Sequence, residues 1–275
     1  MCEVYRYNAK IYSTDFFQYK ENMKIGFVGK GGSGKSTLST LFVKYLEQSG
    51  KNVLAIDADY NMDLTNNLKG PKEMQFIGAG MPDVLAHIEK GYNTAHVHGP
   101  ECKHEHELLM SPEFALSPLD TVSEKYSFPV SEHVRLMSAG PITKAMLQSQ
   151  NCNHELIEAL KVYLPFLKLQ ENEFAVIDER AGIDGLSTGV TSGFDVAIVV
   201  VEATENSMRV GKQIIDLLEF FGTKYLFALN KVVDEAKEID MFMDFYKNVP
   251  DVIVPFEREP SLAFAEKILE KIVQK

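Results

Sequence analysis

Cysteine is scarce in this chain of 275 residues, which contains only Cys2, Cys102 and Cys152. Three cysteines are too few, and odd in number, for a disulfide framework, so we expect a reducing compartment, the cytoplasm. Long apolar runs are also lacking, and none approaches the ~20 residues that a membrane-spanning helix needs. The opening segment is polar and aromatic and does not resemble a secretory leader. The sequence therefore predicts no membrane association.

Basic residues are outnumbered. The chain has 28 Lys and Arg against 39 Asp and Glu, a formal net charge of −11, and no run of basic residues of the kind found in nucleic-acid-binding arms. Contacts to phosphate backbones need clustered cations. We therefore expect no nucleic-acid partner.

The most specific pattern present is a glycine-rich stretch that follows a short apolar run at residues 25–28 and precedes apolar residues at helical spacing. It satisfies G-x-x-x-x-G-K-[ST], the P-loop, in the strand-before, helix-after context that this motif requires. Glycines let consecutive backbone N–H groups converge on an anion, Lys35 supplies a cation for the β- and γ-phosphates, and Ser36 offers a hydroxyl to Mg²⁺. The predicted nucleotide-binding residues are Gly29, Lys30, Gly31, Gly32, Ser33, Gly34, Lys35, Ser36 and Thr37.

Apolar runs and helical segments alternate along the rest of the chain. This alternation predicts an α/β fold with a mostly parallel, doubly wound sheet of about seven strands and helices on both faces. We divide the chain into an N-terminal extension at 1–22 and a single P-loop domain at 23–275, with an irregular insertion at 66–132. The expected strands are residues 24–28, 52–57, 133–139, 174–178, 195–201, 224–229 and 251–255.

Carboxylates follow two of the expected strands. Asp57, Asp59 and Asp63 come at or just after the strand at 52–57, and Asp178 ends the strand at 174–178. Residues at the carboxyl ends of parallel strands face the ligand in open α/β sheets. Asp178 fits the Walker B pattern, in which an aspartate holds Mg²⁺. The alternative is that these are ordinary solvated carboxylates at strand ends.

Lys30, one position after the first glycine, makes the loop resemble the deviant P-loop of the MinD/ParA/nitrogenase-iron-protein class of ATPases. The resemblance implies a homodimer in the ATP state, in which Lys30 reaches the partner's nucleotide. It also implies that Asp59 orients the attacking water and that Asp63 lies near the Mg²⁺ shell. On this basis Lys30, Lys35 and Asp59 are the expected catalytic residues, and Ser36, Asp59 and Asp178 the expected Mg²⁺ site.

The same resemblance implies contacts to the adenine base. It assigns them to Asn230 at the end of one strand and to the loop Pro255, Phe256 and Glu257 after the last strand, and Lys231 is a further expected nucleotide-binding residue.

Within the class, residues 178–184 resemble the D-x-x-A-G-(hydrophobic)-(D/E) stretch of CooC-type ATPases, which insert nickel into carbon monoxide dehydrogenase. CooC-type proteins bind metal across the dimer through a C-x-C pair ahead of Walker B, and this chain has Cys152-Asn153-His154 in that place. Cys152 and His154 would still supply two ligands per subunit for Ni²⁺ or Zn²⁺. The alternative is that Cys152 is a buried, inert thiol.

A second set of candidate ligands lies in the insertion. Imidazole and thiolate groups suit Zn, Ni or Cu, although their spacing here matches no closed zinc-finger pattern. A solvated polar loop is the alternative. The candidates are His96, His98, Cys102, His104 and His106.

Three functions remain open. The first is a CooC-like accessory ATPase that uses ATP and Mg²⁺ to assist the maturation of a metalloenzyme client. The second is a positioning ATPase of the MinD/ParA type, and the third is a nickel-handling GTPase. Guanine selection normally uses N-K-x-D, whereas Asp234 falls four places after Asn230. An iron–sulfur role is not expected, because no cysteine follows Asp178.

Overall fold

The computed structural model describes residues 22–71, 73–91, 113–144, 155–183, 190–257 and 261–274. Several candidate residues lie outside these ranges, as does the predicted extension apart from Asn22. The candidates concerned are His96, His98, Cys102, His104, His106, Cys152 and His154.

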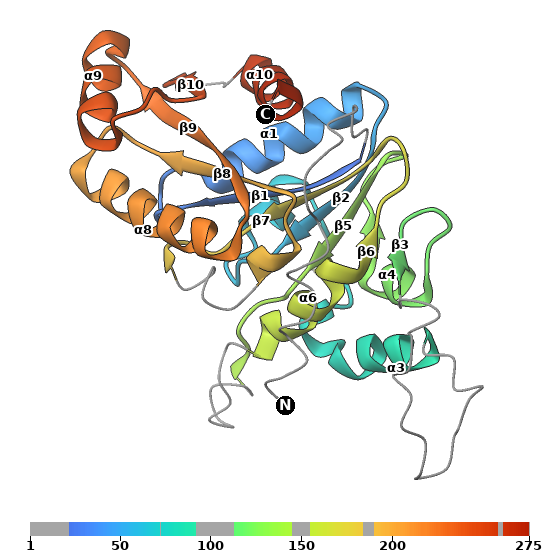
Figure 1. The fold of residues 1–275 in the computed structure, drawn as a ribbon. Helices are drawn as coiled ribbons and strands as arrows, with labels where there is room; N and C mark the ends of the chain where they lie inside the picture. Colours follow the sequence, from blue (N-terminus) through green and yellow to red (C-terminus); the bar gives the residue numbers. More distant parts are fainter. Residues whose placement is uncertain are drawn as a thin grey trace, which may run out of the picture.

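An eight-stranded sheet in the order β10-β9-β8-β1-β7-β2-β5-β4 forms the centre of the molecule (Figure 1). Neighbouring strands are parallel except for β4, which pairs antiparallel with β5. The predicted mostly parallel α/β fold is confirmed. The strands are β1 (Met23–Gly29), β2 (Asn52–Asp57), β4 (Ser127–Pro129), β5 (Val134–Ser138), β7 (Glu173–Asp178), β8 (Val196–Val201), β9 (Lys224–Val232) and β10 (Val252–Pro255).

The sequence predicted about seven strands, and the additional one is β4. It has three residues and lies at the edge of the sheet. A segment this short shows too few side-chain alternations to be recognised from its pattern. The central strands are easier to recognise, because parallel strands covered on both faces are continuous apolar runs.

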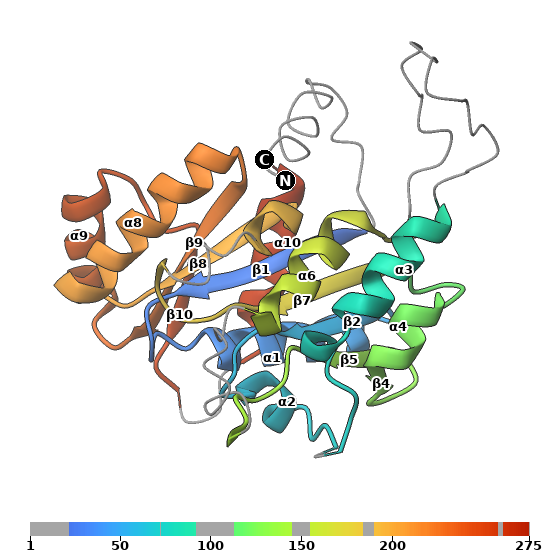
Figure 2. The same ribbon diagram turned by 90° about the horizontal axis from the view of Figure 1, so that it is seen from below.

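Helices cover both faces of the sheet (Figure 2). One face packs against helices α1 (Lys35–Gln48), α2 (Asp63–Asn67) and α10 (Ala263–Gln274), whose apolar residues belong to a single core with alternate residues of the strands. The other face packs against a second core. Its helices are α3 (Met81–Gly91), α4 (Thr121–Tyr126), α6 (Glu155–Phe166), α8 (Glu205–Phe221) and α9 (Glu235–Tyr246).

The alternation of a strand distributes β1 between these two cores. Phe27 packs in the core beneath α1, where its ring centroid lies 5.6 Å from that of Phe42, and Val28 packs in the core on the other face. Both side chains are completely buried. Because one core packs against each side of β1, packing on both faces of the sheet fixes the position of the loop that follows this strand.

Residues 66–132 contain regular structure in their described parts. These include a 3-10 helix at Ile77–Ala79, α3, α4 and β4, together with β3 (Phe114–Ala115), which forms a small parallel sheet with β6 (Leu167–Lys168). Gly78 packs tightly against α6, because an added Cβ there would lie 2.8 Å from Leu156. The described parts of this stretch therefore pack onto the domain.

The connections between strands decide where a ligand can bind. From β1 the chain runs to β2 and β5 on one side, returns to β7 between β1 and β2, and then continues through β8, β9 and β10 on the other side of β1. The strand order thus reverses at β1, and in open α/β sheets ligands bind beyond the carboxyl ends of the strands at such a point.

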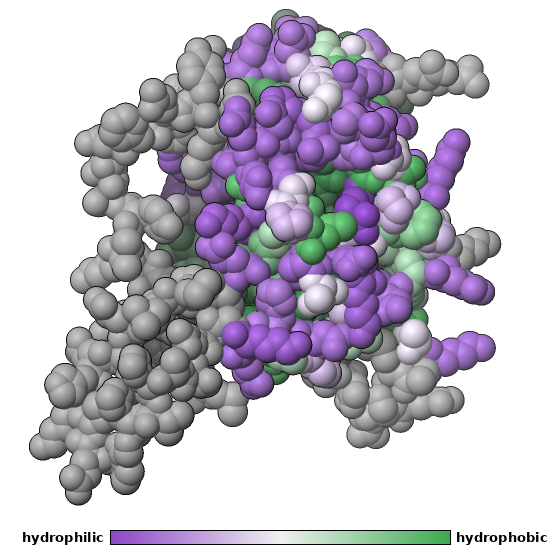
Figure 3. All heavy atoms as spheres, turned by 90° about the vertical axis from the view of Figure 1, so that its right-hand side faces the viewer, coloured by the Kyte–Doolittle hydropathy of each residue, from purple (hydrophilic) through white to green (hydrophobic). Residues whose placement is uncertain are grey.

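The face on the side of α3 and α4 offers no broad apolar surface among its coloured residues (Figure 3). Hydrophilic residues dominate it, and the apolar ones form small separate areas.

Over the described ranges, no helix has both the length and the apolar character needed to cross a membrane.

Candidate nucleotide-binding site

The glycine-rich loop joins β1 to α1 in a conformation that needs glycine at two positions. Gly29 has φ +153°, and an added Cβ there would lie 2.3 Å from the Val200 carbonyl oxygen. Gly34, at φ +100°, would place a Cβ 2.3 Å from Asn230 Nδ2. The first turn of α1 has no acidic side chain and no side-chain cap. Its N–H groups therefore suit an anion at the positive end of the helix dipole.

The two lysines of the loop occupy different environments. Lys35 is 6 % exposed, and its Nζ donates a hydrogen bond of 3.4 Å to the Lys30 carbonyl. Burial lowers the pKa of Lys35, and the carboxylates of Asp178 and Asp59 oppose this effect. Lys30 is partly exposed, and its Nζ lies 3.5 Å from the Gly31 carbonyl oxygen. Lys35 is thus held inside the loop, and Lys30 lies at the surface of the protein.

Two aspartates end adjacent strands side by side, because Asp57 of β2 and Asp178 of β7 are direct partners in the parallel register. Asp57 is satisfied internally: its Oδ2 accepts hydrogen bonds of 2.7 Å from both the N–H and the hydroxyl of Thr65. Burial raises the pKa of Asp57 to about 6. Asp57 therefore stabilises the start of α2 rather than facing a ligand.

Asp178 has no such partners. It is fully buried, and neither carboxylate oxygen accepts a hydrogen bond within the described part of the chain. Burial raises its pKa to about 7, and the Asp57 carboxylate adds to this effect. The Ser36 hydroxyl, which is near the carboxylate but lacks the geometry of a hydrogen bond, and Lys35 act in the opposite direction. An unpaired buried carboxylate is costly unless a cation or a donor satisfies it.

The residues present fit a magnesium ion. Mg²⁺ prefers hard oxygen ligands and commonly takes one carboxylate together with a hydroxyl and phosphate oxygens. Asp178 and Ser36 bring those two oxygen types together beside the phosphate loop. Asp59 is close enough to influence the charges of both Asp178 and Lys35. Its Oδ1 accepts a 3.1 Å hydrogen bond from the Asn61 N–H, and Asp63 begins α2.

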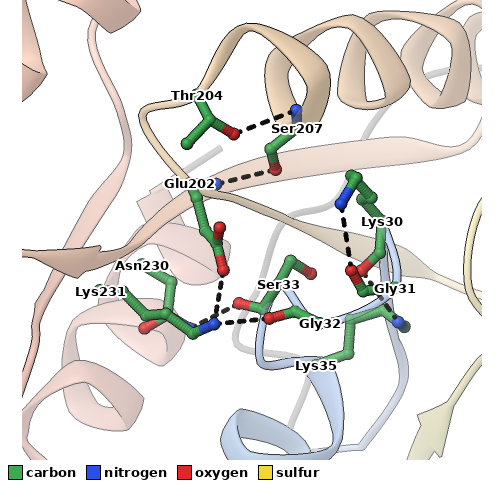
Figure 4. Close-up of polar contacts among 10 residues, drawn as sticks. All are labelled: Lys30, Gly31, Gly32, Ser33, Lys35, Glu202, Thr204, Ser207, Asn230 and Lys231. Atoms are coloured by element: carbon green, nitrogen blue, oxygen red, sulfur yellow. Dashed lines mark hydrogen bonds and ion pairs between the residues drawn. The ribbon is translucent and has the colours of Figure 1, made fainter.

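The ends of β8 and β9 hold the phosphate loop from the other side (Figure 4). Asn230 Nδ2 donates a 2.7 Å hydrogen bond to the Ser33 carbonyl, and Lys231 Nζ donates a 2.6 Å hydrogen bond to the Gly32 carbonyl. Lys231 also forms an ion pair of 2.5 Å with Glu202, whose backbone N–H donates to the Ser207 hydroxyl of α8. Lys231 has a positive φ of 61°, a conformation uncommon for a residue with a side chain.

Asn230 was predicted as a base contact and Lys231 as a nucleotide-binding residue, and in the structure both side chains donate to carbonyls of the phosphate loop. Glu202 was not identified from the sequence, although an acidic residue directly after the buried strand β8 is a signal of the kind that identified Asp178. Glu179 was also missed. It is fully buried, its Oε2 has no hydrogen-bond partner among the described residues, and burial raises its pKa to about 8.

The effect of Asn230→Ala on different nucleotides distinguishes the two roles of Asn230. If the amide holds the loop, the variant leaves the Ser33 carbonyl without its donor, and we expect ATP, ADP and GTP all to bind about tenfold more weakly. If the amide reads the base, the loss is confined to adenine nucleotides. Isothermal titration with the three nucleotides measures the affinity of each, and Asn66→Ala, at another exposed amide on α2, is the control.

The loop after β10 supplies an exposed apolar side chain near the end of β9. Phe256 is 67 % exposed, and its N–H donates a 2.8 Å hydrogen bond to the Val232 carbonyl. Pro255 ends β10 and Glu257 follows. An exposed aromatic ring next to the end of β9 suits stacking on a base, and the assignment of these three residues to adenine stays a prediction.

A strand, a glycine loop and a helix carrying Lys35 and Ser36, together with an unpaired aspartate at the end of a neighbouring strand, define a P-loop nucleotide-binding protein. More narrowly, the chain belongs to the CobQ/CobB/MinD/ParA nucleotide binding domain family, whose model matches residues 27–253. The predicted membership of the MinD/ParA class is confirmed.

Relatives and solved structures agree with this family. The chain is 29 % identical over 241 residues to the uncharacterized ATP-binding protein MJ0084 of Methanocaldococcus jannaschii, covering 86 % of this chain and 89 % of that protein. It is 26 % identical to the carbon monoxide dehydrogenase accessory protein CooC of Rhodospirillum rubrum, covering 81 % and 79 %. The MinD cell division protein of Aquifex aeolicus has the same fold, with a TM-score of 0.57 at 19 % identity, covering 92 % and 97 %.

Proposed function

We propose that this protein hydrolyses ATP with Mg²⁺, dimerises when ATP is bound, and serves as an accessory ATPase in the maturation of a metalloenzyme. The observation that carries the enzymatic part is the buried Asp178 carboxylate, which accepts no hydrogen bond from the described residues and lies next to Ser36 and Lys35. A Mg²⁺ ion with its phosphates would satisfy this carboxylate and explain why the fold tolerates it.

Each residue of the site has a defined part in this proposal. Lys35 and the loop N–H groups bind the phosphates, and Mg²⁺ when bound neutralises charge on the β- and γ-phosphates. Asp59 orients the attacking water. Lys30, at the protein surface, extends to the γ-phosphate held by the partner subunit, as an arginine finger does in other P-loop enzymes. Hydrolysis breaks the bond between the β- and γ-phosphates, and departure of the inorganic phosphate then removes the charge that the partner's lysine contacts.

The surroundings of Asp234 favour ATP over GTP. Its Oδ1 accepts a 3.3 Å hydrogen bond from the Lys237 N–H at the start of α9, so this carboxylate caps a helix. In the N-K-x-D pattern the aspartate binds guanine, and here the only nearby aspartate is one residue too late and already bonded. The chain therefore lacks the aspartate that the N-K-x-D pattern of GTPases places three residues after the asparagine.

The maturation role is supported by the relative named as a carbon monoxide dehydrogenase accessory protein, which is similar over most of this chain. No group of three or more metal-ligating side chains occurs in the described ranges, and the candidate ligands Cys152 and His154 lie outside them. Nickel or zinc would be a cargo for a client enzyme, held between two subunits.

Measurement of phosphate release and molar mass tests the proposal directly. We expect Mg²⁺-dependent ATP hydrolysis that EDTA abolishes, and light scattering that shows a dimer with a slowly hydrolysed ATP analogue and a monomer with ADP. Metal analysis of the wild type and of Cys152→Ser, each with and without nucleotide, tests the cargo. Sedimentation of the ATP-bound protein with liposomes or DNA, without bound metal, would instead favour a positioning ATPase.

A further inference from the structure

Two side chains pair across the two loops that carry the carboxylates of the site. The guanidinium carbon of Arg180 lies 4.3 Å from the centroid of the Tyr60 ring, and Arg180 Nη1 donates a 3.3 Å hydrogen bond to the Tyr60 hydroxyl. A guanidinium group is planar, so it can lie over an aromatic face and still donate hydrogen bonds from its edge. The two contacts together fix both the distance and the orientation of the side chains.

The position of each residue in the chain connects the pair to the reaction. Tyr60 directly follows Asp59 in the first loop, residues 58–62, and Arg180 comes two residues after Asp178 in the second loop, residues 179–183. The two loops are also joined where they leave the sheet, because the Ala58 N–H donates a 3.0 Å hydrogen bond to the Asp178 carbonyl. The Tyr60–Arg180 pair extends this connection outward from the sheet.

The second loop in turn contacts the phosphate loop. The Gly182 N–H donates a 2.9 Å hydrogen bond to the Gly29 carbonyl, and an added Cβ at Gly31 would lie 3.5 Å from the Ala181 methyl group. Residues 179–183 therefore contact the phosphate loop directly, so a change in the conformation of that loop acts on them. Arg180 of the same stretch contacts Tyr60 of the first loop.

Negatively charged side chains surround the pair and help to hold the Arg180 guanidinium group in place. The Arg180 N–H donates a 3.0 Å hydrogen bond to Glu179 Oε1, and the carboxylates of Glu179 and Asp59 both act on the Tyr60 hydroxyl. Tyr60 also packs against the apolar core beneath α6. The ring is therefore held on one side by the core and on the other by the guanidinium group.

We propose that Tyr60 and Arg180 are positioning residues that make the two carboxylate loops move together, so that the state of the phosphate loop sets the position of Asp59. This inference rests on the proposed ATPase activity, and it assigns no direct contact with nucleotide to either residue. The pair acts on the rate of the chemical step, because it controls the residue that orients the water and leaves the phosphate-binding groups unchanged.

A double-mutant cycle with Tyr60→Ala and Arg180→Ala tests the coupling. We expect each single variant to lower kcat by about tenfold, the scale of a partly desolvated cation–π contact, with KM for ATP changed by less than about threefold. The double variant should be no slower than the slower single variant, because both remove the same contact. Losses that multiply in the double variant, or a change confined to KM, would overturn the proposal.

Conservative and matched variants separate positioning from general damage. Tyr60→Phe keeps the ring face and loses the hydroxyl, so it should recover most of the activity lost in Tyr60→Ala. Arg209→Ala removes an exposed arginine on α8 that pairs with Glu205, and it should leave kcat unchanged. Thermal unfolding of every variant checks that the fold is retained.

Fluorescence tests the pair without any hydrolysis. The chain contains no tryptophan, so Tyr60→Trp introduces the only indole, the aromatic ring that binds cations best. We expect the emission of this variant to change when Arg180→Ala is added and to stay the same when Arg209→Ala is added. Identical spectra would show that the pair does not form, whereas a spectral change in a protein without ATPase activity would contradict the proposed function alone.

Discussion

Lys30→Ala is expected to lower kcat for ATP hydrolysis by about a thousandfold, the lower end of the effect of removing an arginine finger. ATP binding to the isolated subunit should change by less than about threefold, because Lys35 and the loop N–H groups remain in place. The structure gives Lys30 a surface position and a weak contact with the neighbouring Gly31 carbonyl. Its expected target is therefore the partner's γ-phosphate. Phosphate release and isothermal titration measure the two quantities.

Mixing two inactive variants shows whether Lys30 acts across the dimer. In a mixed dimer of Lys30→Ala with Asp59→Ala, one of the two sites has an intact Asp59 and receives an intact Lys30 from the other subunit. An equimolar mixture should therefore recover about a quarter of the wild-type rate if subunits exchange freely in a symmetric dimer. Lys44→Ala, an exposed lysine on α1, is the control and should retain full activity. A mixture as inactive as its components would rule out the shared site.

Asp178→Asn is expected to abolish Mg²⁺-dependent hydrolysis and at the same time to stabilise the protein without nucleotide. The carboxylate is buried without a hydrogen-bond partner in the described residues, and Asp57 stands beside it in the sheet. An amide has nearly the same shape and no charge, so the substitution should raise the free energy of unfolding by about 2 kcal/mol at pH 8. For a domain of this size, the midpoint of thermal unfolding should rise by about 4 °C.

The raised pKa of Asp178 determines how the stability of the wild-type protein changes with pH. The pKa of Asp178 is about 7 in the folded protein against an ordinary value of 3.8, so between these values the folded protein holds a proton that the unfolded chain has released. The free energy of unfolding therefore falls as the pH rises from about 4 to about 7, and it stays lowered above that range. Asp57 and Glu179, with pKa values raised to about 6 and about 8, act in the same direction.

Unfolding midpoints between pH 5 and pH 8 test this prediction. Asp178→Asn should show a shallower decline than the wild type, with the two proteins close at pH 5 and the variant more stable at pH 8. Asp216→Asn, at an exposed position on α8 where it pairs with Lys212, is the matched control and should follow the wild type. Parallel curves for Asp178→Asn and the wild type would contradict the assigned burial, and retained hydrolysis would contradict the magnesium role.

Sequence patterns identified well those site residues whose role can be recognised from the residues next to them in the chain. The phosphate loop needs Gly29, Gly34, Lys35 and Ser36 at fixed offsets between a strand and a helix, and the structure places them in that arrangement. Asp178 was identified because it ends a buried strand. Such features depend on local backbone geometry, which a short stretch of sequence specifies.

The residues that were missed depend on neighbours far away in the chain. Glu202 meets Lys231 because β8 and β9 are adjacent, and Arg180 meets Tyr60 because β7 inserts beside β2. Nothing in the flanking sequence of Glu202 or Tyr60 indicates these partners. These pairs depend on which strands are adjacent, and the order of the strands is a property of the whole folded sheet.

The sequence by itself determined that this protein has an α/β fold with a P-loop, because apolar periods and motif offsets are local properties of the chain. Lys30 within that loop supplied the resemblance to the MinD/ParA class. Only the tertiary structure decided that Asp57 is satisfied internally while Asp178 is left without a partner, although both are aspartates at the ends of buried strands. The physical reason is that the hydrogen-bond partners of a buried charge come from whichever elements pack against it. Thr65 of α2 donates to Asp57, whereas for Asp178 the described part of the chain brings only the Ser36 hydroxyl near, without the geometry of a hydrogen bond.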